Sequence, residues 1–279
     1  MNAAGQIQLA ERFRELHRGP ALLLLPNAWD ALSARIFGAA GFAAVATTSG
    51  GVSWALGFAD GEAAPWSEVV AATARIVRAV AVPVTADIEA GFGDTPQAVG
   101  NSVAEIIAAG AVGINLEDGM TRGPAPIRSV ADAARRIEAA REAARAAGVP
   151  IVINARTDLY LRNLGDPVTR FDETVERGRA YLAAGADCVY PIGLRDSDTI
   201  SRLVKTLAAP VNVNVRAGSP SVAELEALGV ARASTASQIA LMAATTMRQI
   251  AEELKTTGRF DALAPALAQA DLQHLFAGG

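Results

Sequence analysis

The chain has 279 residues, of which 51% are hydrophobic and 19% charged, and its formal net charge is −4. This composition supports a sizeable core and excludes a disordered chain, and the absence of a basic patch argues against a nucleic-acid partner. The polar start of the chain, the lack of a long apolar run and the single cysteine predict a cytoplasmic protein with no membrane partner and no internal disulfide.

Short runs rich in β-branched residues or leucine alternate with longer segments in which apolar residues recur every three or four positions. The short runs predict eight strands, at residues 21–26, 43–48, 82–88, 112–117, 150–155, 187–192, 210–215 and 231–235. The longer segments predict helices at residues 65–80, 96–109, 127–147, 172–184, 196–208 and 221–228.

Eight strands alternating with helices predict an α/β fold, a (β/α)8 TIM barrel formed by a single domain over residues 1–279. A doubly wound open sheet is the competing architecture, but no G-x-G-x-x-G motif follows the first predicted strand. Residues 257–279 are predicted to form a C-terminal helical tail, with an amphipathic helix over 260–276 that packs on its own barrel or on a neighbouring subunit.

Rare residue types narrow the chemistry. The two lysines, Lys205 and Lys255, fall on predicted outer helices, which argues against a Schiff-base aldolase. The two histidines, His17 and His274, lie in the terminal segments and are predicted to be solvated, and Cys188 is predicted to be a buried, inert thiol. A histidine-dependent triad or a zinc site therefore has no suitable residues.

Carboxylates gather where predicted strands end. Asp87 and Glu89 are two residues apart and share one side of their strand, Glu117 ends the next strand, and Asp60 follows the second. Buried acids need a counter-charge, and oxygen ligands without nitrogen or sulfur favour Mg²⁺ or Mn²⁺. Pairing with an arginine such as Arg156, or helix capping, is the alternative interpretation.

Two further patterns suit an anionic ligand. Arg156 ends the strand after Glu117 and can bind a carboxylate or stabilise an enolate, although an ion pair with Asp158 or Glu117 is the alternative. The hydroxyls and backbone amides of residues 47–51 follow the second strand and fit an anionic group. The loops 216–219 and 233–235 follow the last two strands, where many barrels bind phosphate, and support a rival prediction of a phosphosugar-binding barrel.

Taken together, these motifs resemble the isocitrate lyase/phosphoenolpyruvate mutase superfamily over residues 5 to 255. The resembling segments are residues 26–31, 48–51, 60, 86–93, 116–118 and 154–158. The resemblance implies that Asp87 binds Mg²⁺ directly, and that Asp60, Glu89 and Glu117 hold its water ligands. It implies catalytic roles for Arg156, Glu117 and Asp60.

The resemblance also implies a substrate site. Arg156 and the backbone amides of Ser49 and Gly50 would bind the substrate carboxylate, with Trp29 and Thr48 beside them, and Asn214 matches a substrate-contacting asparagine. Members typically bind 2-oxo acids and break C–C or P–C bonds through a metal-stabilised enolate. Their subunits usually exchange a C-terminal helix in a tetramer, which implies a homo-oligomer here, a dimer or a tetramer, with the tail swapped between subunits.

Departures from the pattern narrow the substrate. Isocitrate and methylisocitrate lyases carry Lys-(Lys/Arg)-Cys-Gly-His after the fourth strand, and phosphoenolpyruvate mutases carry Asp-Lys-x-x-Pro-Lys, whereas residues 118–124 read DGMTRGP here. Ile192 and Leu241 stand where methylisocitrate lyase has a glutamate and an arginine. The chain thus resembles a 2-methylisocitrate lyase-like or carboxyphosphonoenolpyruvate phosphonomutase-like member without the catalytic cysteine loop.

These observations predict an Mg²⁺-dependent lyase that cleaves a C–C bond of a small 2-oxo or 2-hydroxy diacid, such as oxaloacetate, or decarboxylates it. The alternatives are a P–C bond phosphonomutase or phosphonopyruvate hydrolase, and a non-catalytic 2-oxo acid-binding protein. The acid that protonates the enolate is unassigned, with a metal-bound water and Tyr160 as the candidates.

Overall fold

The computed structural model describes residues 2–120 and 126–277. Its strands are short and all neighbours in a sheet run parallel. They are β1 (Leu23–Leu25), β2 (Asn27–Ala28), β3 (Val45–Thr47), β4 (Val84–Asp87), β5 (Gly113–Glu117), β6 (Val152–Thr157), β7 (Cys188–Pro191), β8 (Asn212–Asn214) and β9 (Arg232–Ser234). Each predicted strand is present, and the first is divided at Pro26, which has no N–H to donate.

The strands form two sheets, with orders β2-β3-β4-β5-β6-β7 and β1-β9-β8. A single parallel bridge between Val189 and Val211 lies between β7 and the residue before β8. The prediction of an α/β fold with parallel strands is confirmed. The expected closed eight-stranded ring is confirmed only in part, because the strand pairing stops between the two sheets.

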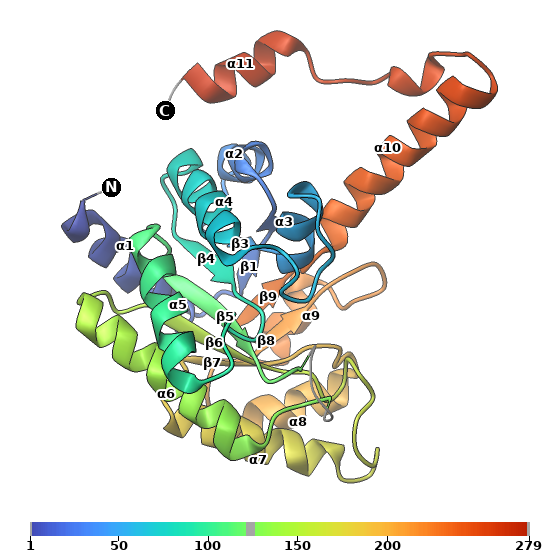
Figure 1. Ribbon diagram of the computed structural model, residues 1–279. Coiled ribbons are helices and arrows are strands. Elements are labelled where there is room, and N and C mark those ends of the chain that lie inside the picture. The colour runs from blue at the N-terminus through green and yellow to red at the C-terminus, as the bar shows by residue number, and fades with distance from the viewer. Residues whose placement is uncertain (1, 121–125, 278–279) are drawn as a thin grey trace.

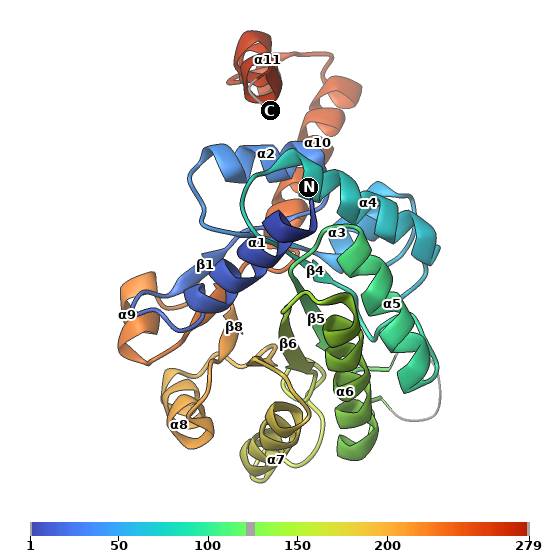
Figure 2. The same ribbon diagram turned by 90° about the vertical axis from the view of Figure 1, so that its left-hand side faces the viewer.

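Helices surround the strands (Figures 1 and 2). Their bounds are α1 (Ala3–Leu16), α2 (Ala31–Ala39), α3 (Ser49–Ala55), α4 (Trp66–Ala79), α5 (Pro96–Ala108), α6 (Val130–Ala147), α7 (Arg170–Ala183), α8 (Ser197–Leu207), α9 (Val222–Ala227), α10 (Gln238–Thr256) and α11 (Gln269–Ala277), with a 3-10 turn η1 (Asp261–Leu263). The predicted outer helices are present. The predicted helix ranges leave out α1, α2, α3 and α10; for α2 the available signal was the capping box that Asp30 and Ser33 form at its start.

The C-terminal segment leaves the body of the molecule. Helix α10 projects outward in Figure 1, and α11 returns above α2, where the Arg35 guanidinium lies 5.7 Å from the Phe276 ring centroid. The prediction of one helix over 260–276 is wrong, because η1 is followed by Pro265, which cannot continue a helix, and α11 begins only at Gln269. None of the described helices is long and apolar enough to span a membrane.

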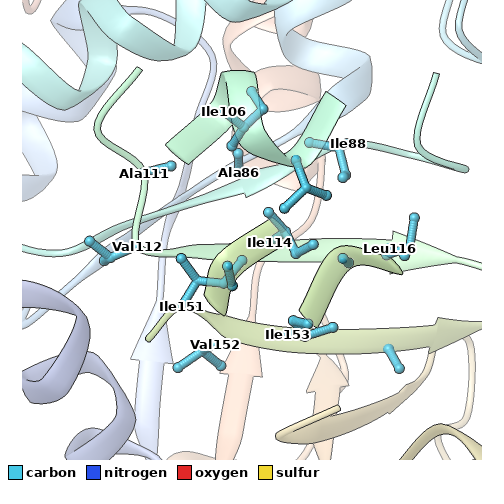
Figure 3. Packing of buried hydrophobic residues seen from close by; sticks show 14 of the residues in the cluster. Ala86, Ile88, Ile106, Ala111, Val112, Ile114, Leu116, Ile151, Val152 and Ile153 are labelled. Carbon is cyan, nitrogen blue, oxygen red and sulfur yellow. The ribbon is translucent and has the colours of Figure 1, made fainter. Parts of the chain in front are cut away.

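Alternation along the strands separates the core from the site. On β5, Ile114 and Leu116 pack with Ala86 and Ile88 of the neighbouring strand and with Ile106 of α5 (Figure 3). The residues between them in sequence point to the other face, because successive strand side chains alternate. That face is polar, and carries Thr85, Asp87, Asn115, Glu117, Asn154 and Arg156.

The polar face also holds a buried cation. Arg232 of β9 is fully buried, and its Nη2 donates to Asn115 Oδ1 at 3.0 Å. His17 lies beside it, with its Nε2 3.5 Å from Arg232 Nη1, and is only 4% exposed. The prediction that His17 is solvated is therefore wrong: burial and the Arg232 charge lower its pKa to about 3. The Phe13 carbonyl oxygen lies 2.7 Å from its Nδ1.

The remaining rare residues lie as predicted. Lys205, Lys255 and His274 are exposed on outer helices. Cys188 is buried, and burial raises the pKa of its thiol to about 12, so the thiol is protonated and inert near neutral pH.

Candidate active site

The predicted site residues gather where β3, β4, β5 and β6 end. Glu117 and Arg156 are register partners on β5 and β6, and the Glu117 N–H donates to the Glu89 carbonyl at 2.9 Å. Asp87 ends β4, and Ser49 begins α3 directly after β3. Carboxylates, a guanidinium and free backbone amides therefore share one edge of the sheet.

Asp87 is half-buried and held loosely. Its N–H donates to Thr47 Oγ1 at 2.8 Å, which fixes the backbone at the end of the strand. Among the residues that the structure describes, its carboxylate accepts two long hydrogen bonds, both 3.4 Å, from the N–H groups of Ser49 and Glu89. Most of its lone pairs are therefore free for a ligand. Thr47 is the first residue of the segment 47–51 that the sequence suggested for an anionic group, and here its hydroxyl supports the backbone of Asp87.

Glu89 lies in a strained turn. Its Oε2 accepts from the Glu62 N–H at 2.7 Å, and Glu62 Oε1 accepts from the Phe92 N–H at 2.7 Å. Glu62, Glu89 and Phe92 have positive φ angles of 59°, 51° and 51°, a conformation that is costly for residues other than glycine. Glu62 was not predicted, and its place two residues after Asp60 was the available signal.

The acids repel one another. Burial, together with the negative charges of Asp60 and Asp87, raises the pKa of Glu89 to about 8. Burial also raises the pKa of Asp87, and that of Glu117 to about 8, although Arg156 opposes both shifts. Asp60 is exposed and acts on this cluster through its charge. A divalent cation would remove the repulsion.

Arg156 contacts both acids that the sequence offered as alternative partners. Its Nη1 lies 2.5 Å from Glu117 Oε2, and its Nε donates to Asp158 Oδ1 at 2.7 Å. The remaining N–H groups of the guanidinium have no acidic partner among residues 2–120 and 126–277. The ion pairs exist, and donors for an anionic ligand are still left.

The turn after β3 is packed tightly. A Cβ atom on Gly51 would lie 2.6 Å from Thr48 Cγ2 and 2.8 Å from Trp29 Cβ, so only glycine fits there. The Thr48 hydroxyl lies 2.7 Å from Ser237 Oγ, which ties the turn to the start of α10. The structure thus brings together Trp29 and Thr48, and places Gly50 in the first turn of α3 with Ser49.

Other candidates lie apart from this cluster. Asn214 ends β8, and its Oδ1 accepts from the Gly193 N–H at 2.9 Å, joining two loops at the same edge. Tyr160 packs into the hydrophobic cluster outside the sheet, with Arg170 over its ring at 5.7 Å, so the structure does not support it as the acid.

Tyr190 was missed by the sequence reading. It is the register partner of Arg156 on β7 and is buried on the polar face. Burial raises the pKa of its phenol to about 12, with Arg156 opposing the shift, so the phenol carries its proton at neutral pH. Tyr190 thus offers a protonated hydroxyl group beside the Arg156 guanidinium.

The loop that departs from the resembling enzymes begins at Asp118, which faces away from the cluster. Its carboxylate accepts from the Tyr181 hydroxyl at 2.6 Å and from the Asp158 N–H at 3.0 Å. Residues 121–125, on which the prediction of a missing acid depends, lie outside the described residues. Ile192 and Leu241 are the two residues that stand where methylisocitrate lyase has a glutamate and an arginine. Ile192 is buried, and Leu241 is exposed on α10.

The donor set fits a hard divalent cation. Within the described ranges, no three carboxylate, imidazole or thiol groups come close enough to surround an ion by themselves. Carboxylate oxygens are the ligands that such a cation prefers, and Asp87, Glu89 and Glu117 supply them at one edge of the sheet.

Comparison with known proteins gives consistent matches. The family described as phosphoenolpyruvate phosphomutase matches residues 13–255. The chain is 31% identical to 2,3-dimethylmalate lyase of Eubacterium barkeri over 227 residues, covering 79% of this chain and 77% of that protein. It is 29% identical to 2-methylisocitrate lyase of Halalkalibacterium halodurans over 217 residues, covering 75% and 68%.

A solved structure supports the same relationship. Oxaloacetate acetylhydrolase in complex with its product oxalate superposes with a TM-score of 0.85 at 26% sequence identity, covering 98% of this chain and 99% of that one.

Proposed function

The chain belongs to the isocitrate lyase/phosphoenolpyruvate mutase superfamily, whose members are lyases and mutases, and from that premise we propose that it is an Mg²⁺- or Mn²⁺-dependent lyase acting on a small 2-oxo or 2-hydroxy diacid. The reaction is C–C cleavage or decarboxylation through an enolate. The observation that carries this proposal is that Asp87, Glu89 and Glu117 share one edge of the sheet with Arg156, which contacts Glu117.

Four acids would hold the metal. Asp87 would bind it directly, and Asp60, Glu89 and Glu117 would hold its water ligands; the mutual repulsion that raises the pKa of Glu89 supports a cation among these acids. When bound there, a divalent cation withdraws electron density from the oxo and carboxylate oxygens of the substrate and so lowers the barrier to enolate formation.

Arg156 would hold the substrate carboxylate with the N–H groups that Glu117 and Asp158 leave free. The backbone amides of Ser49 and Gly50 would donate to the same ligand, with Thr48 and Trp29 shaping the pocket and Asn214 reaching from the opposite sheet. The buried Ile192 and the exposed Leu241 offer no charged partner for a third carboxylate, which favours a diacid.

Tyr190 would supply the proton that the enolate carbon needs. Its place beside Arg156 supports this role, and the guanidinium would stabilise the phenolate left behind until solvent returns the proton. Tyr190 replaces Tyr160, the candidate that the sequence suggested.

The assembly is also part of the proposal. We take the two sheets as one barrel that closes between β7 and β8, where Val189 and Val211 already pair. The C-terminal arm, residues 257–279 with α10, leaves apolar side chains such as Met242, Met247 and Phe260 exposed by more than half. A partner subunit covering this arm would form a dimer or tetramer.

The test is turnover of a substrate panel. Purified protein with Mg²⁺ is incubated with oxaloacetate, 2,3-dimethylmalate, 2-methylisocitrate and phosphonopyruvate, and products are followed by NMR, with Asp87→Asn as the control that removes the metal ligand. We expect cleavage of a diacid that Asp87→Asn abolishes.

The other outcomes separate the alternatives. Turnover of phosphonopyruvate alone identifies a P–C bond mutase or hydrolase. Metal-dependent binding of the panel without any turnover identifies a non-catalytic 2-oxo acid-binding protein. The phosphosugar alternative would show sugar-phosphate binding that Asp87→Asn leaves unchanged.

A further inference from the structure

Asp158 holds two guanidinium groups at once. It is fully buried, its Oδ1 accepts from Arg156 Nε at 2.7 Å, and its Oδ2 accepts from Arg162 Nε at 2.9 Å. Its own N–H donates to Asp118 Oδ1 at 3.0 Å, which fixes the backbone as well. The carboxylate therefore has one orientation, and each of its oxygens serves a different arginine.

The contact with Arg156 determines which donors face the site. The guanidinium is planar with five N–H groups in a fixed fork, so binding Nε on one side fixes the direction of the other two nitrogens. Glu117 accepts from Nη1, and Nη2 has no acidic partner in the ranges 2–120 and 126–277. Without Asp158, the long arginine side chain would lose this single orientation.

The contact with Arg162 connects Asp158 to the segment after β5. Arg162 Nη1 donates to the Met120 carbonyl at 3.1 Å. A Cβ atom on Gly119 would lie 2.7 Å from Asp158 Oδ2 and 3.0 Å from Arg162 Nη2, so the backbone at Gly119 packs directly on this ion pair. Asp158 is thereby supported from a side that faces away from Arg156.

We propose that Asp158 is a positioning residue that aims Arg156 at the substrate carboxylate, and that Arg162 holds Asp158 in place for that purpose. The role rests on the proposed function, because it needs Arg156 to bind a carboxylate. Asp158 itself touches no substrate in this scheme, and its effect on ligand affinity passes through the Arg156 guanidinium.

Asp187 is the matched control. It also holds two arginines, with its carboxylate 2.5 Å from Arg141 Nη2 and 3.4 Å from Arg14 Nη2, and it also accepts a backbone hydrogen bond, from the Ile153 N–H at 2.9 Å. It precedes β7, at the opposite end of the strands from Glu117 and Arg156. A purely structural role would make Asp158 and Asp187 equivalent.

The first experiment uses oxalate as the probe, because it has two adjacent carboxylates and resembles the planar end of a 2-oxo acid. Calorimetry measures Mg²⁺ alone, and then oxalate at saturating Mg²⁺, with wild type, Asp158→Asn and Asp187→Asn. An amide puts an NH2 donor in place of one carboxylate oxygen and carries no charge, so the guanidinium group that used that oxygen loses its acceptor.

We expect Asp158→Asn to weaken oxalate binding about 10-fold or more while leaving Mg²⁺ affinity nearly unchanged. Asp187→Asn should change oxalate binding by no more than about twofold. Equal oxalate affinity in the two variants would overturn the proposal. If Asp158→Asn does not fold, Arg162→Met replaces it and should weaken oxalate binding while leaving Mg²⁺ affinity nearly unchanged. An Arg162→Met variant that binds oxalate as tightly as wild type would also overturn the proposal.

A second experiment needs no ligand, and so separates this proposal from the proposed function. The Arg156 Nε–H signal, assigned by its loss in Arg156→Lys, should exchange slowly with solvent in wild type and in Asp187→Asn, and rapidly in Asp158→Asn. Slow exchange in all three would refute the positioning role. Failure of wild type to bind oxalate with Mg²⁺, with the exchange pattern as expected, would instead count against the proposed function.

Discussion

Glu117 and Arg156 face each other across two neighbouring strands, with Oε2 and Nη1 2.5 Å apart and side chains only 7% and 13% exposed. One belongs to the acids that would hold the metal, and the other is the cation that would hold the substrate. Removing either charge should therefore affect both metal binding and substrate binding, since a buried ion left without its partner is strongly destabilising.

Substituting one member of this pair separates stability from binding. Arg156→Gln should lower the free energy of unfolding by about 2–4 kcal/mol, because it removes the guanidinium that both Glu117 and the fully buried Asp158 contact. It should also weaken oxalate binding about 100-fold through the loss of two charge-assisted hydrogen bonds. Denaturant unfolding and calorimetry measure the two effects.

The double variant Glu117→Gln with Arg156→Gln supplies the control. It should recover part of the lost stability, because Glu117 no longer lacks its partner while Asp158 keeps Arg162, and it should not recover oxalate binding. Recovery of binding in the double variant would show that Arg156 does not contact the ligand.

The two glutamates predict how pH acts on the metal-free protein. Their pKa values are about 8 in the folded state against an ordinary value of 4.5, so the folded state binds more protons between these values. Stability from Glu89 and Glu117 is therefore present below about pH 4.5 and is lost as the pH rises towards about 8. Thermal unfolding in EDTA should show the melting temperature falling over this range.

Mg²⁺ should reverse this trend, because it binds the ionised carboxylates and releases protons. The rise in melting temperature on adding Mg²⁺ should therefore grow from about pH 6 to about pH 8. Glu89→Gln removes one titrating group and should flatten the dependence. A rise of the same size at every pH would contradict the assignment of these acids to the metal.

Gly51 tests the packing of the turn after β3. In Gly51→Ala the new methyl group meets Thr48 and Trp29, and such overpacking should cost about 1–3 kcal/mol of unfolding free energy. Gly19→Ala is the matched control, since nothing closer than 4.0 Å surrounds that position. Denaturant unfolding compares them, and equal stability would mean that the turn has room for a side chain.

Strand periodicity predicted most of the site because it fixes which residues end neighbouring strands. Asp87, Glu117 and Arg156 are brought together by register alone, and register follows from the apolar pattern. Side-chain pairing does not follow from it: the sequence offered Asp158 and Glu117 as alternatives for Arg156, and the guanidinium reaches both.

Burial at the other end of the strands was not predictable from local pattern. His17 stands in a polar, charged segment, yet α1 carries Phe13 against the sheet, where a Cβ on Gly113 would lie 2.7 Å from the Phe13 ring. Contacts between segments 100 residues apart decide such burial, and the residue pattern within either segment does not predict these contacts. The same holds for the positive φ of Glu62 and Glu89, which their mutual hydrogen bond maintains.

Tyr190 predicts a specific loss of turnover. Tyr190→Phe removes the proposed proton donor and should slow product formation about 100-fold to 1000-fold while oxalate affinity with Mg²⁺ is retained. Tyr160→Phe serves as the control, because that ring lies in the hydrophobic cluster outside the sheet. Loss of activity in Tyr160→Phe with normal turnover in Tyr190→Phe would reverse the assignment.

The C-terminal arm predicts the oligomeric state. Met242 and Met247 on the projecting helix α10 are 63% and 64% exposed, Phe260 beyond that helix is 69% exposed, and a single chain gains nothing from such exposure. Sedimentation should give a dimer or tetramer for the full chain, and a smaller species after truncation at residue 257 or in Met242→Glu with Met247→Glu. Val168→Glu is the control, since Val168 is 84% exposed before α7 and away from the arm. A full-length monomer, or assembly that both arm variants retain, would show that the arm packs on no second copy.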